Sequence, residues 1–415
     1  MRILHISTRL ILGGSQENTV LSCEAQALAG HEVHLAFGPI YGPEGSLLER
    51  VERFRTPEGR SIQTHVAPDL VREISPLRDW RAYGQLRALI ERLKPDVVHT
   101  HSSKAGILGR AAAWEAGGRD GRVRVVHTIH GPPFMPAEGS ATARLKTRLL
   151  NGAYTVAERF AANRCHAIVS VADAMTREFL ARGIGEPAQY VTVRSGMEVD
   201  AFLVPRAGET REEMRRALGL GEGDYVLGTV ARLAQHKGHD DLLDALGEVL
   251  RVQRTWRLLW VGDGWWRERL VAKARAMGLG VRTLDRGGEA DPDAQVVLTG
   301  LVPPERVPAM MRAMDVLAHP SYREGLPRTV PQALLCGVPV IAYDVDGTRE
   351  ACREGETGRL VKPGDVAGLR EAAMWMWDHA GERSAMGSRG RAMCREAFSV
   401  EAMAAGLERV YRGNR

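Results

Sequence analysis

The stretch of sequence that decides the fold is HPSYREGLPRTVPQALLCGVPVIAY, residues His319 to Tyr343. It starts at the end of the apolar run Val316 to His319, passes through a segment of helical length, and ends in the β-branched run Val338 to Tyr343. That order predicts a strand, a helix and a second, parallel strand. Glu324 lies in the strand-to-helix turn, where free N–H groups and the positive end of a helix dipole favour anionic ligands. We therefore expect an α/β fold with a ligand site at the ends of its strands.

Short apolar runs alternate with helical-length segments along the whole chain, which is typical of βαβ units and parallel sheets. The expected strands are Arg2 to Ser7, Glu32 to Phe37, Asp96 to His101, Arg124 to Thr128, Ala167 to Val171 and Tyr190 to Arg194 in the first half, and Tyr225 to Val230, Trp256 to Gly262, Val296 to Thr299, Val316 to His319, Val338 to Tyr343 and Gly358 to Val361 in the second. Because 415 residues exceed one ordinary domain, each half is expected to form its own doubly wound, Rossmann-like sheet.

The boundary between the two expected domains, 1–200 and 201–393, falls in a loop-like stretch from Asp200 to Gly208. Residues 54–74 and 285–293 carry Gly, Pro and charge, so both are also expected to be loops. The last part of the chain, 394–415, is expected to be helical.

Composition excludes several classes of protein. With 44% hydrophobic and 26% charged residues the chain is globular, and no apolar run approaches the roughly 18 residues of a membrane span. The net charge of +5 is too weak, and aromatic residues at 6% too few, for a nucleic-acid partner. Five scattered cysteines predict reduced thiols, and the N-terminus lacks the pattern of a signal peptide, so we expect a cytoplasmic protein.

Three motifs in the second half lie where expected strands end. Arg232 and Lys237 lie five residues apart in a strand-to-helix turn, where both cations can point at a diphosphate, although exposed basic pairs are also common on ordinary surfaces. Gly262 belongs to a Val-Gly-Asp-Gly turn that has a purely structural explanation as well, with the aspartate capping a helix. Gly300 follows the expected strand Val296 to Thr299.

The first half has glycines and histidines where strands end. Gly13, Gly14 and Ser15 follow the first strand and precede a helix expected to begin at Gln16, so the backbone can approach an anionic ligand closely. Two histidine clusters end later strands, and we expect His101 and His130 to lie in the ligand site because ligands bind beyond the carboxyl ends of parallel strands. We expect the other two clustered histidines, His99 and His127, to lie in the core or behind the site. A zinc site is the alternative for these four histidines, but no carboxylate or cysteine lies at ligand spacing.

In this order the motifs resemble those of glycosyltransferase family 4, a family of retaining enzymes with the GT-B fold. The resemblance covers nearly the whole chain and implies two Rossmann-like domains that face each other across a cleft, with the C-terminal helix crossing back to the first domain. It also implies transfer of a sugar from a UDP- or GDP-sugar to a hydroxyl acceptor with retention of anomeric configuration. The site residues that it implies are Glu324, His130, Arg232 and Lys237 for catalysis, Gly13, Gly14, Gly262, Gly300, Arg323, Gly325, Leu326, Pro327 and Gln332 for the donor, and Ser15, His101 and Lys104 for the acceptor.

One position departs from the family pattern, because Gln332 stands where the family has a second glutamate that accepts hydrogen bonds from the ribose. An amide oxygen still accepts, so we expect altered donor affinity and not a loss of chemistry. Two alternatives remain open: a sugar-nucleotide-binding protein with weakened turnover, and a GT-B epimerase that acts on UDP-sugars. No D-x-D motif is present, and metal independence with no cofactor is the expectation for this fold.

A narrower resemblance comes from the run HTHSSKAGILGRAAAW, residues His99 to Trp114. This run is similar to the corresponding part of bacterial transferases that build surface polysaccharides and lipid-linked oligosaccharides. It implies a glycan or lipid-linked acceptor, whose phosphate Lys104 and Arg110 could meet. The basic and apolar segment Ala143 to Leu150 fits contact with the anionic inner face of the cytoplasmic membrane, and it fits an ordinary surface helix equally well.

Overall fold

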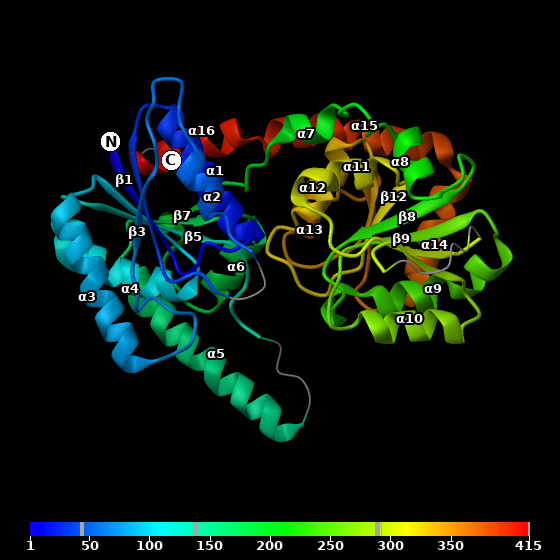
Figure 1. Ribbon diagram of the computed structural model, residues 1–415. Helices are drawn as coiled ribbons and strands as arrows, with labels where there is room; N and C mark the ends of the chain where they lie inside the picture. Colours follow the sequence, from blue (N-terminus) through cyan, green and yellow to red (C-terminus); the bar gives the residue numbers. More distant parts are fainter. Residues whose placement is uncertain (42–44, 136–139, 287–290, 292, 414–415) are drawn as a thin grey trace. The chain divides into compact units, whose positions relative to one another are not determined.

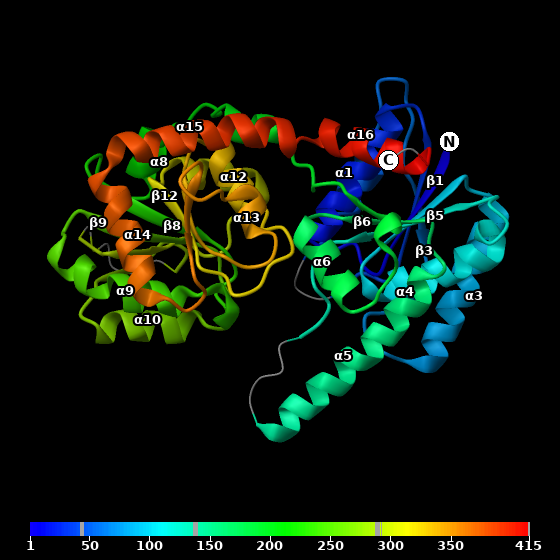
Figure 2. The same cartoon turned by 180° about the vertical axis from the view of Figure 1, so that it is seen from behind.

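The computed structural model describes residues 1–41, 45–135, 140–286, 291 and 293–413. The chain forms two compact units, one made of Met1–Met197 together with Val400–Arg415 and the other of Glu198–Ser399. Within the part of the chain that is described, no helix has the length and apolar character needed to cross a bilayer. Each unit is an α/β structure built on one seven-stranded parallel sheet (Figures 1 and 2).

The sheet of the first unit has the strand order β3-β2-β1-β4-β5-β6-β7. Its strands are β1 (Arg2–Ser7), β2 (Glu32–Phe37), β3 (Gln63–Val66), β4 (Val97–His101), β5 (Arg124–Ile129), β6 (Ala167–Ser170) and β7 (Tyr190–Thr192). Its helices are α1 (Gly14–Leu28), α2 (Leu48–Arg53), α3 (Pro76–Leu93), α4 (Ser103–Ala113), α5 (Ala141–Ala162), α6 (Asp173–Ala181) and α16 (Val400–Tyr411). The central strands are buried on both faces, as a doubly wound sheet requires, although β1, β4 and β5 include histidines.

Helices cover both faces of this sheet, with α1 and α16 side by side on one face and α3, α4 and α5 on the other (Figures 1 and 2). The apolar side of α16 packs on the sheet through Met403, Leu407 and Val410. The last helix of the chain is therefore part of the unit that begins the chain.

The sheet of the second unit has the order β10-β11-β9-β8-β12-β13-β14. Its strands are β8 (Tyr225–Val230), β9 (Trp256–Val261), β10 (Val281–Thr283), β11 (Val296–Leu298), β12 (Val316–His319), β13 (Val340–Tyr343) and β14 (Gly358–Val361). Its helices are α7 (Val199–Leu203), α8 (Arg211–Ala217), α9 (His239–Val252), α10 (Arg267–Ala276), α11 (Val307–Arg312), α12 (Thr329–Leu335), α13 (Thr348–Ala351), α14 (Val366–Asp378) and α15 (Ala380–Ala397). The quoted stretch forms the expected strand, helix and parallel strand, β12-α12-β13.

The strand order of each sheet reverses at one point. In the first unit the chain winds outward from β1 in one direction and from β4 in the other, and in the second unit from β8 and β12. Ligands of open α/β sheets bind at this reversal, beyond the carboxyl ends of the two central strands. The topology therefore selects the loops after β1, β4, β8 and β12 as the places to look for a site.

Several local expectations were wrong. The segment 54–74 is not all loop, since it contains the edge strand β3, whose residues are only partly buried and lack an apolar alternation. The stretch from Asp200 to Gly208 begins inside the short helix α7. Helix α1 starts two residues before Gln16, at Gly14. The expected loop 285–293 lies partly outside the described residues, and just before it the short strand β10 extends the sheet.

The C-terminal region contains a break between α15, which ends at Ala397, and α16, which begins at Val400. The unit boundaries consequently lie at Glu198 and Val400, a few residues from the expected 200/201 and 393/394. The whole of α15 packs with the second unit, where it contacts α12. Only α16 belongs to the first.

Candidate functional site

In the second unit, the loops after β8 and β12 hold each other in place. The backbone N–H of Tyr322 donates to the carbonyl of His236 over 2.8 Å, and the hydroxyl of Ser321 donates to the same carbonyl over 3.2 Å. Between them Gly238 has a φ of 70°, and a Cβ there would lie 2.1 Å from the carbonyl oxygen of Pro320. Only glycine fits this close approach, so the loop after β8 and the loop after β12 are fixed relative to each other.

Glu324 is the centre of this arrangement. Its Oε1 atom lies 2.6 Å from Nζ of Lys237 and 3.2 Å from Nε2 of His319, and its backbone N–H donates to Asp346 over 2.7 Å. Burial alone would raise the pKa of the Glu324 carboxyl, but His319 and Lys237 together outweigh burial and hold that pKa well below its ordinary value. The structure thus joins two expected site residues, Glu324 and Lys237, in an ionised pair.

His319 and Asp346 are neighbours of Glu324 to which the sequence interpretation gave no role. His319 ends β12 and lay inside the quoted stretch, so its position was readable, but its direction toward Glu324 was not. Asp346 is more distant from Glu324 in sequence. It lies in the loop after β13, and its own φ is 44°. Burial raises the pKa of Asp346, against the hydrogen bond from Glu324 that lowers it.

Arg232 and Gly262 lie on two neighbouring turns after β8 and β9. The guanidinium of Arg232 lies 5.6 Å from the centre of the Trp265 ring, within the range of a cation–π contact. Gly262 has a φ of 135°, and a Cβ there would lie 2.2 Å from the carbonyl oxygen of Ala231. Its N–H donates to the carbonyl of Gly300 over 3.0 Å. The fold therefore requires glycine at position 262 whether or not this residue also touches a ligand.

The other expected donor residues differ in their accessibility. Gly325 and Arg323 are half-buried, whereas Leu326 and Pro327 are buried and pack into the unit. Gln332 lies in α12 with its side chain partly exposed, and that amide makes no hydrogen bond with any other residue that the structure describes. The amide of Gln332 therefore has its hydrogen-bonding groups available to a ligand.

In the first unit, the loop after β1 leads into α1 at the expected glycines. Gly13 and Gly14 are exposed, and the Ser15 hydroxyl donates to the side chain of Gln16 over 2.9 Å. The loop after β4 turns at Ser102, whose φ of 62° is unusual for a residue with a side chain. These two loops flank the strand-order reversal of this sheet.

The expected histidines occupy the carboxyl ends of β4 and β5. Nδ1 of His101 lies 3.0 Å from Nε2 of His130, so these two residues contact each other as one pair. His127 points to the opposite face, where its ring contacts Thr100 and leaves no room for a Cβ on Gly106. His99 is fully buried behind His101.

Two basic residues of α4 are already paired within the unit. Nζ of Lys104 lies 2.6 Å from a carboxylate oxygen of Asp79 and also donates to the carbonyl of Glu73. Arg110 was expected within reach of an acceptor phosphate, and that was wrong: it is fully buried and forms an ion pair of 2.6 Å with buried Glu158. The helical period places Arg110 on the inner face of α4.

Comparison with known proteins identifies the family. The model of the family described as "Glycosyltransferase Family 4" matches residues 12–220, and that described as "Glycosyl transferases group 1" matches residues 210–393. The chain belongs to glycosyltransferase family 4. Together the two matched regions run from residue 12 to residue 393 and include every strand except β1.

Named relatives of this family 4 chain are glycosyltransferases. The chain is 32% identical over 291 residues to the 2-deoxystreptamine N-acetyl-D-glucosaminyltransferase of Streptomyces fradiae, covering 68% of this chain and 62% of that enzyme. It is 25% identical over 382 residues to the UDP-Gal:alpha-D-GlcNAc-diphosphoundecaprenol alpha-1,3-galactosyltransferase of Escherichia coli, covering 91% and 88%. Among solved structures, Anabaena HepE in complex with UDP superimposes over the full length of both chains with a TM-score of 0.75 at 18% identity, which shows the shared fold.

Proposed function

We propose that this family 4 protein transfers a sugar from a nucleotide sugar to a hydroxyl acceptor with retention of anomeric configuration. The observation that carries the proposal is the ionised Glu324–Lys237 pair. It lies at the reversal point of the second sheet, on two loops that hold each other in place. A carboxylate in this place accepts hydrogen bonds from sugar hydroxyls, and cations beside it stabilise a diphosphate.

The second unit supplies the donor side of the proposal. Lys237 and Arg232 balance the charge that grows on the leaving diphosphate, Lys237 as a point charge and Arg232 as a planar fork that Trp265 helps to orient. Gln332 is proposed to hydrogen-bond the ribose. The donor is proposed to be a UDP-sugar, because the E. coli relative uses UDP-galactose and HepE binds UDP. No metal ion or other cofactor is required in this proposal.

The first unit supplies the acceptor side. His130 is proposed to contact the acceptor hydroxyl. His101 was expected to contact it too, but it is buried with both ring nitrogens hydrogen-bonded, so its proposed part is to hold His130. Ser15 with Gly13 and Gly14 is proposed to contact the donor phosphate and the acceptor. The acceptor is proposed to be a lipid-linked or cell-surface glycan, as in the E. coli relative. Lys104 is proposed to reach the acceptor phosphate only by exchanging its partner Asp79.

Helix α5 supports a peripheral contact with an anionic membrane. Leu145, Leu149, Val156 and Phe160 form one stripe at helical spacing, and each is between 46% and 68% exposed. Arg144, Lys146 and Arg148 flank the stripe. An apolar stripe between cations is the form of a helix that lies in the surface of an anionic bilayer, and Figure 1 shows α5 extending away from the sheet of its own unit.

A binding screen followed by an acceptor assay tests the proposal. Thermal shifts with UDP, GDP, ADP and their common sugars identify the donor, because a ligand that binds the native state raises its melting temperature. We expect a shift with UDP that is lost in Arg232→Ala. Product formation is then measured by mass spectrometry with undecaprenyl-diphosphate N-acetylglucosamine and with 2-deoxystreptamine, and the anomeric configuration by NMR. Binding without transfer would support the weakened alternative, and an isomerised sugar without acceptor the epimerase.

A further inference from the structure

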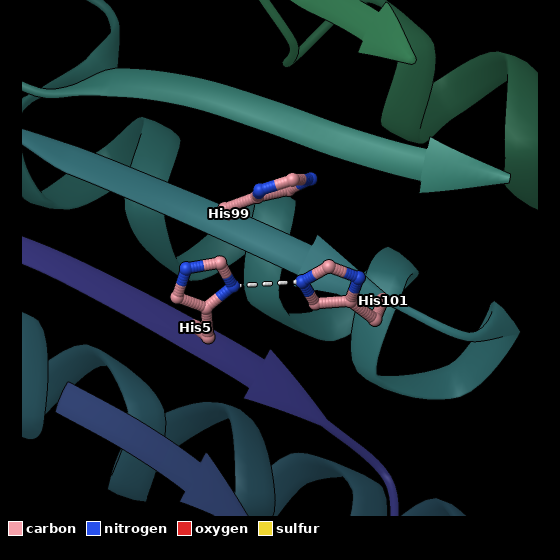
Figure 3. A group of neighbouring side chains, drawn as sticks. All are labelled: His5, His99 and His101. Atoms are coloured by element: carbon pink, nitrogen blue, oxygen red, sulfur yellow. Dashed lines mark hydrogen bonds between the residues drawn. The ribbon is translucent and has the colours of Figure 1, made fainter. Parts of the chain in front are cut away.

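A chain of hydrogen bonds runs through the buried centre of the first unit to His130. Oε1 of Gln26, on α1, lies 2.7 Å from Nε2 of His5. Nδ1 of His5, on β1, lies 2.9 Å from Nε2 of His101, and Nδ1 of His101 lies 3.0 Å from Nε2 of His130. Figure 3 shows the middle link, with His5 and His101 side by side on neighbouring strands and His99 next to them. His5 and His101 thus each use one ring nitrogen for the residue before them in the chain and the other nitrogen for the residue after them.

A second chain of hydrogen bonds begins at the amide nitrogen of Gln26. Nε2 of Gln26 donates to the hydroxyl of Tyr411, on α16, over 2.9 Å. That hydroxyl lies 2.6 Å from Nδ1 of His99, whose Nε2 lies 2.6 Å from the hydroxyl of Thr128. Helix α16 therefore completes a network whose other members come from α1, β1, β4 and β5.

The buried rings of this network are neutral. Burial lowers the pKa of His5 to about 4, and burial together with neighbouring histidines lowers the pKa of His99 and of His101 well below the ordinary value. A neutral imidazole has one N–H donor and one acceptor nitrogen. In a row of neutral rings, each bonded through both nitrogens, the proton position on one ring therefore dictates the proton position on the next.

We infer that the amide of Gln26 sets the tautomer of His130 through His5 and His101. Its oxygen can only accept, so His5 carries its proton on Nε2 and must accept at Nδ1. His101 then carries its proton on Nε2, and His130 carries its own on Nε2 as well. In this state Nδ1 of His130 is an acceptor. Rotation of the amide by 180° would reverse every donor in the row, so the row changes direction only as a unit.

This inference rests on the proposed function for its catalytic meaning. The tautomer decides whether Nδ1 of His130 meets a neighbouring group, including a hydroxyl of a bound sugar, as an acceptor or as an N–H donor. Gln26 and His5 are then positioning residues, which act on the ligand only through His130. The tautomer itself does not depend on which substrate the protein uses.

The same histidines invite comparison with a metal site, since one nitrogen each of His5, His99 and His101 lie within 4.8 Å of one another. A tetrahedral zinc ion with bonds of about 2.0–2.1 Å would hold two ligand nitrogens roughly 3.3 Å apart. The facing nitrogens of His5 and His101 are 2.9 Å apart, which is the spacing of a hydrogen bond. The other nitrogens of His5 and His99 have their own partners. The geometry thus favours the hydrogen-bonded row.

The tautomers are measured by ¹⁵N NMR of the full-length protein labelled at its histidines, with His130→Gln used to assign the His130 signals. We expect the Nε2–H tautomer of His130 in the native protein. In Gln26→Met the row loses its terminal acceptor, and a second population with the proton on Nδ1 of His130 is expected. Gln26→Glu restores an acceptor for His5 and should restore the native tautomer. None of these measurements requires a sugar donor.

Kinetic measurements, with the donor and acceptor that the screen and the acceptor assay identify, supply the second readout. Gln26→Met is expected to lower kcat about tenfold, the factor of one lost hydrogen bond, with little change in KM, and Gln26→Glu to recover most of that loss. The matched control is His34→Gln, which disrupts another histidine pair of the same unit, His34 with His65 at 3.0 Å. That control should change neither kcat nor the tautomer of His130.

Three results would overturn the inference: a native His130 with its proton on Nδ1, a tautomer that does not respond to Gln26→Met in protein shown to be folded by circular dichroism, or one equivalent of tightly bound zinc lost in His5→Gln. If the tautomer follows Gln26 as expected but no nucleotide sugar gives product, the proposed function fails and the inference about the row stands.

Discussion

The most direct test of the proposed donor site is Glu324→Gln, which keeps the shape of the side chain and removes its charge. In the native protein one oxygen of Glu324 lies 2.6 Å from Nζ of Lys237, and the two side chains are 14% and 20% exposed. A hydrogen bond that involves an ionised group contributes about 1.5–3 kcal/mol, against roughly 0.5–1.5 kcal/mol for a neutral one. The loss of charge should therefore destabilise the protein by about 1 kcal/mol.

The effect of Glu324→Gln on turnover should be much larger than its effect on stability. If the carboxylate accepts hydrogen bonds that strengthen as charge develops in the transition state, its loss should lower kcat by about a hundredfold or more. Urea unfolding gives the stability difference and initial rates with the donor give kcat. The control is Glu356→Gln, whose carboxylate pairs with Arg353 at 3.3 Å with both side chains more than half exposed. That change should leave stability and kcat within error.

A double-mutant cycle separates the pair from its two members. Lys237→Met leaves the carboxylate partly buried beside His319 alone and should cost more stability than Glu324→Gln. The combined variant should be more stable than the sum of the two single losses predicts. Additive losses together with an unchanged kcat in Glu324→Gln would refute the placement of this pair in the site.

Four further outcomes are expected. Because the folded pKa of Glu324 is lowered from 4.5, the stability advantage of the native protein over Glu324→Gln should be complete above about pH 5 and fall as the pH drops below that value, measured by urea unfolding across pH. Gln332→Glu should tighten donor binding by about 1 kcal/mol in calorimetry and leave kcat intact, whereas a large loss of kcat would show a specific role for the amide. Leu149→Asp should weaken binding to vesicles that contain phosphatidylglycerol, while Ala143→Asp, which is exposed near the start of α5 and lies on another side of the helix from the apolar stripe, should weaken it less. Incubation with EDTA should leave transfer unchanged, and restoration of lost activity by Mg²⁺ or Mn²⁺ would contradict the proposed metal independence.

Much of the sheet architecture could be predicted because most strands are short runs rich in apolar and β-branched residues, bounded by turn residues. The strand-helix-strand unit β12-α12-β13 follows directly from the stretch around Glu324, and its boundaries differ from the expected ones by at most two residues. The edge strand β3 could not be found this way. Its sequence, QTHV, is half exposed, and the hydrogen bonds to β2 that make it a strand come from a segment about thirty residues away.

The ends of strands also predicted where polar side chains gather, but not which of them touch. His101 and His130 were expected in one site because each ends a parallel strand, and the two rings do contact each other. His5 lies in the middle of β1, among apolar neighbours, and nothing local marks it as their partner. Its contact with His101 depends on the pairing of β1 with β4, strands more than ninety residues apart in sequence. Lys104 illustrates the converse, because its local position suggested a free cation while Asp79, on another helix, pairs with it.

The polar row in the first unit is unusual for the inside of a sheet, and stability alone does not account for it. A buried polar group costs free energy unless it is hydrogen-bonded, and a fully satisfied pair contributes little more than two apolar side chains of the same shape. His5, Gln26 and Tyr411 satisfy one another without net charge, so their value to the fold is small while their removal one at a time is costly. Apolar side chains could not give the row of imidazoles a defined proton order, whereas the Gln26 oxygen, which can only accept a hydrogen bond from His5, does so. Because Tyr411 comes from α16, that order at His130 also depends on the docking of the last helix of the chain onto the first unit.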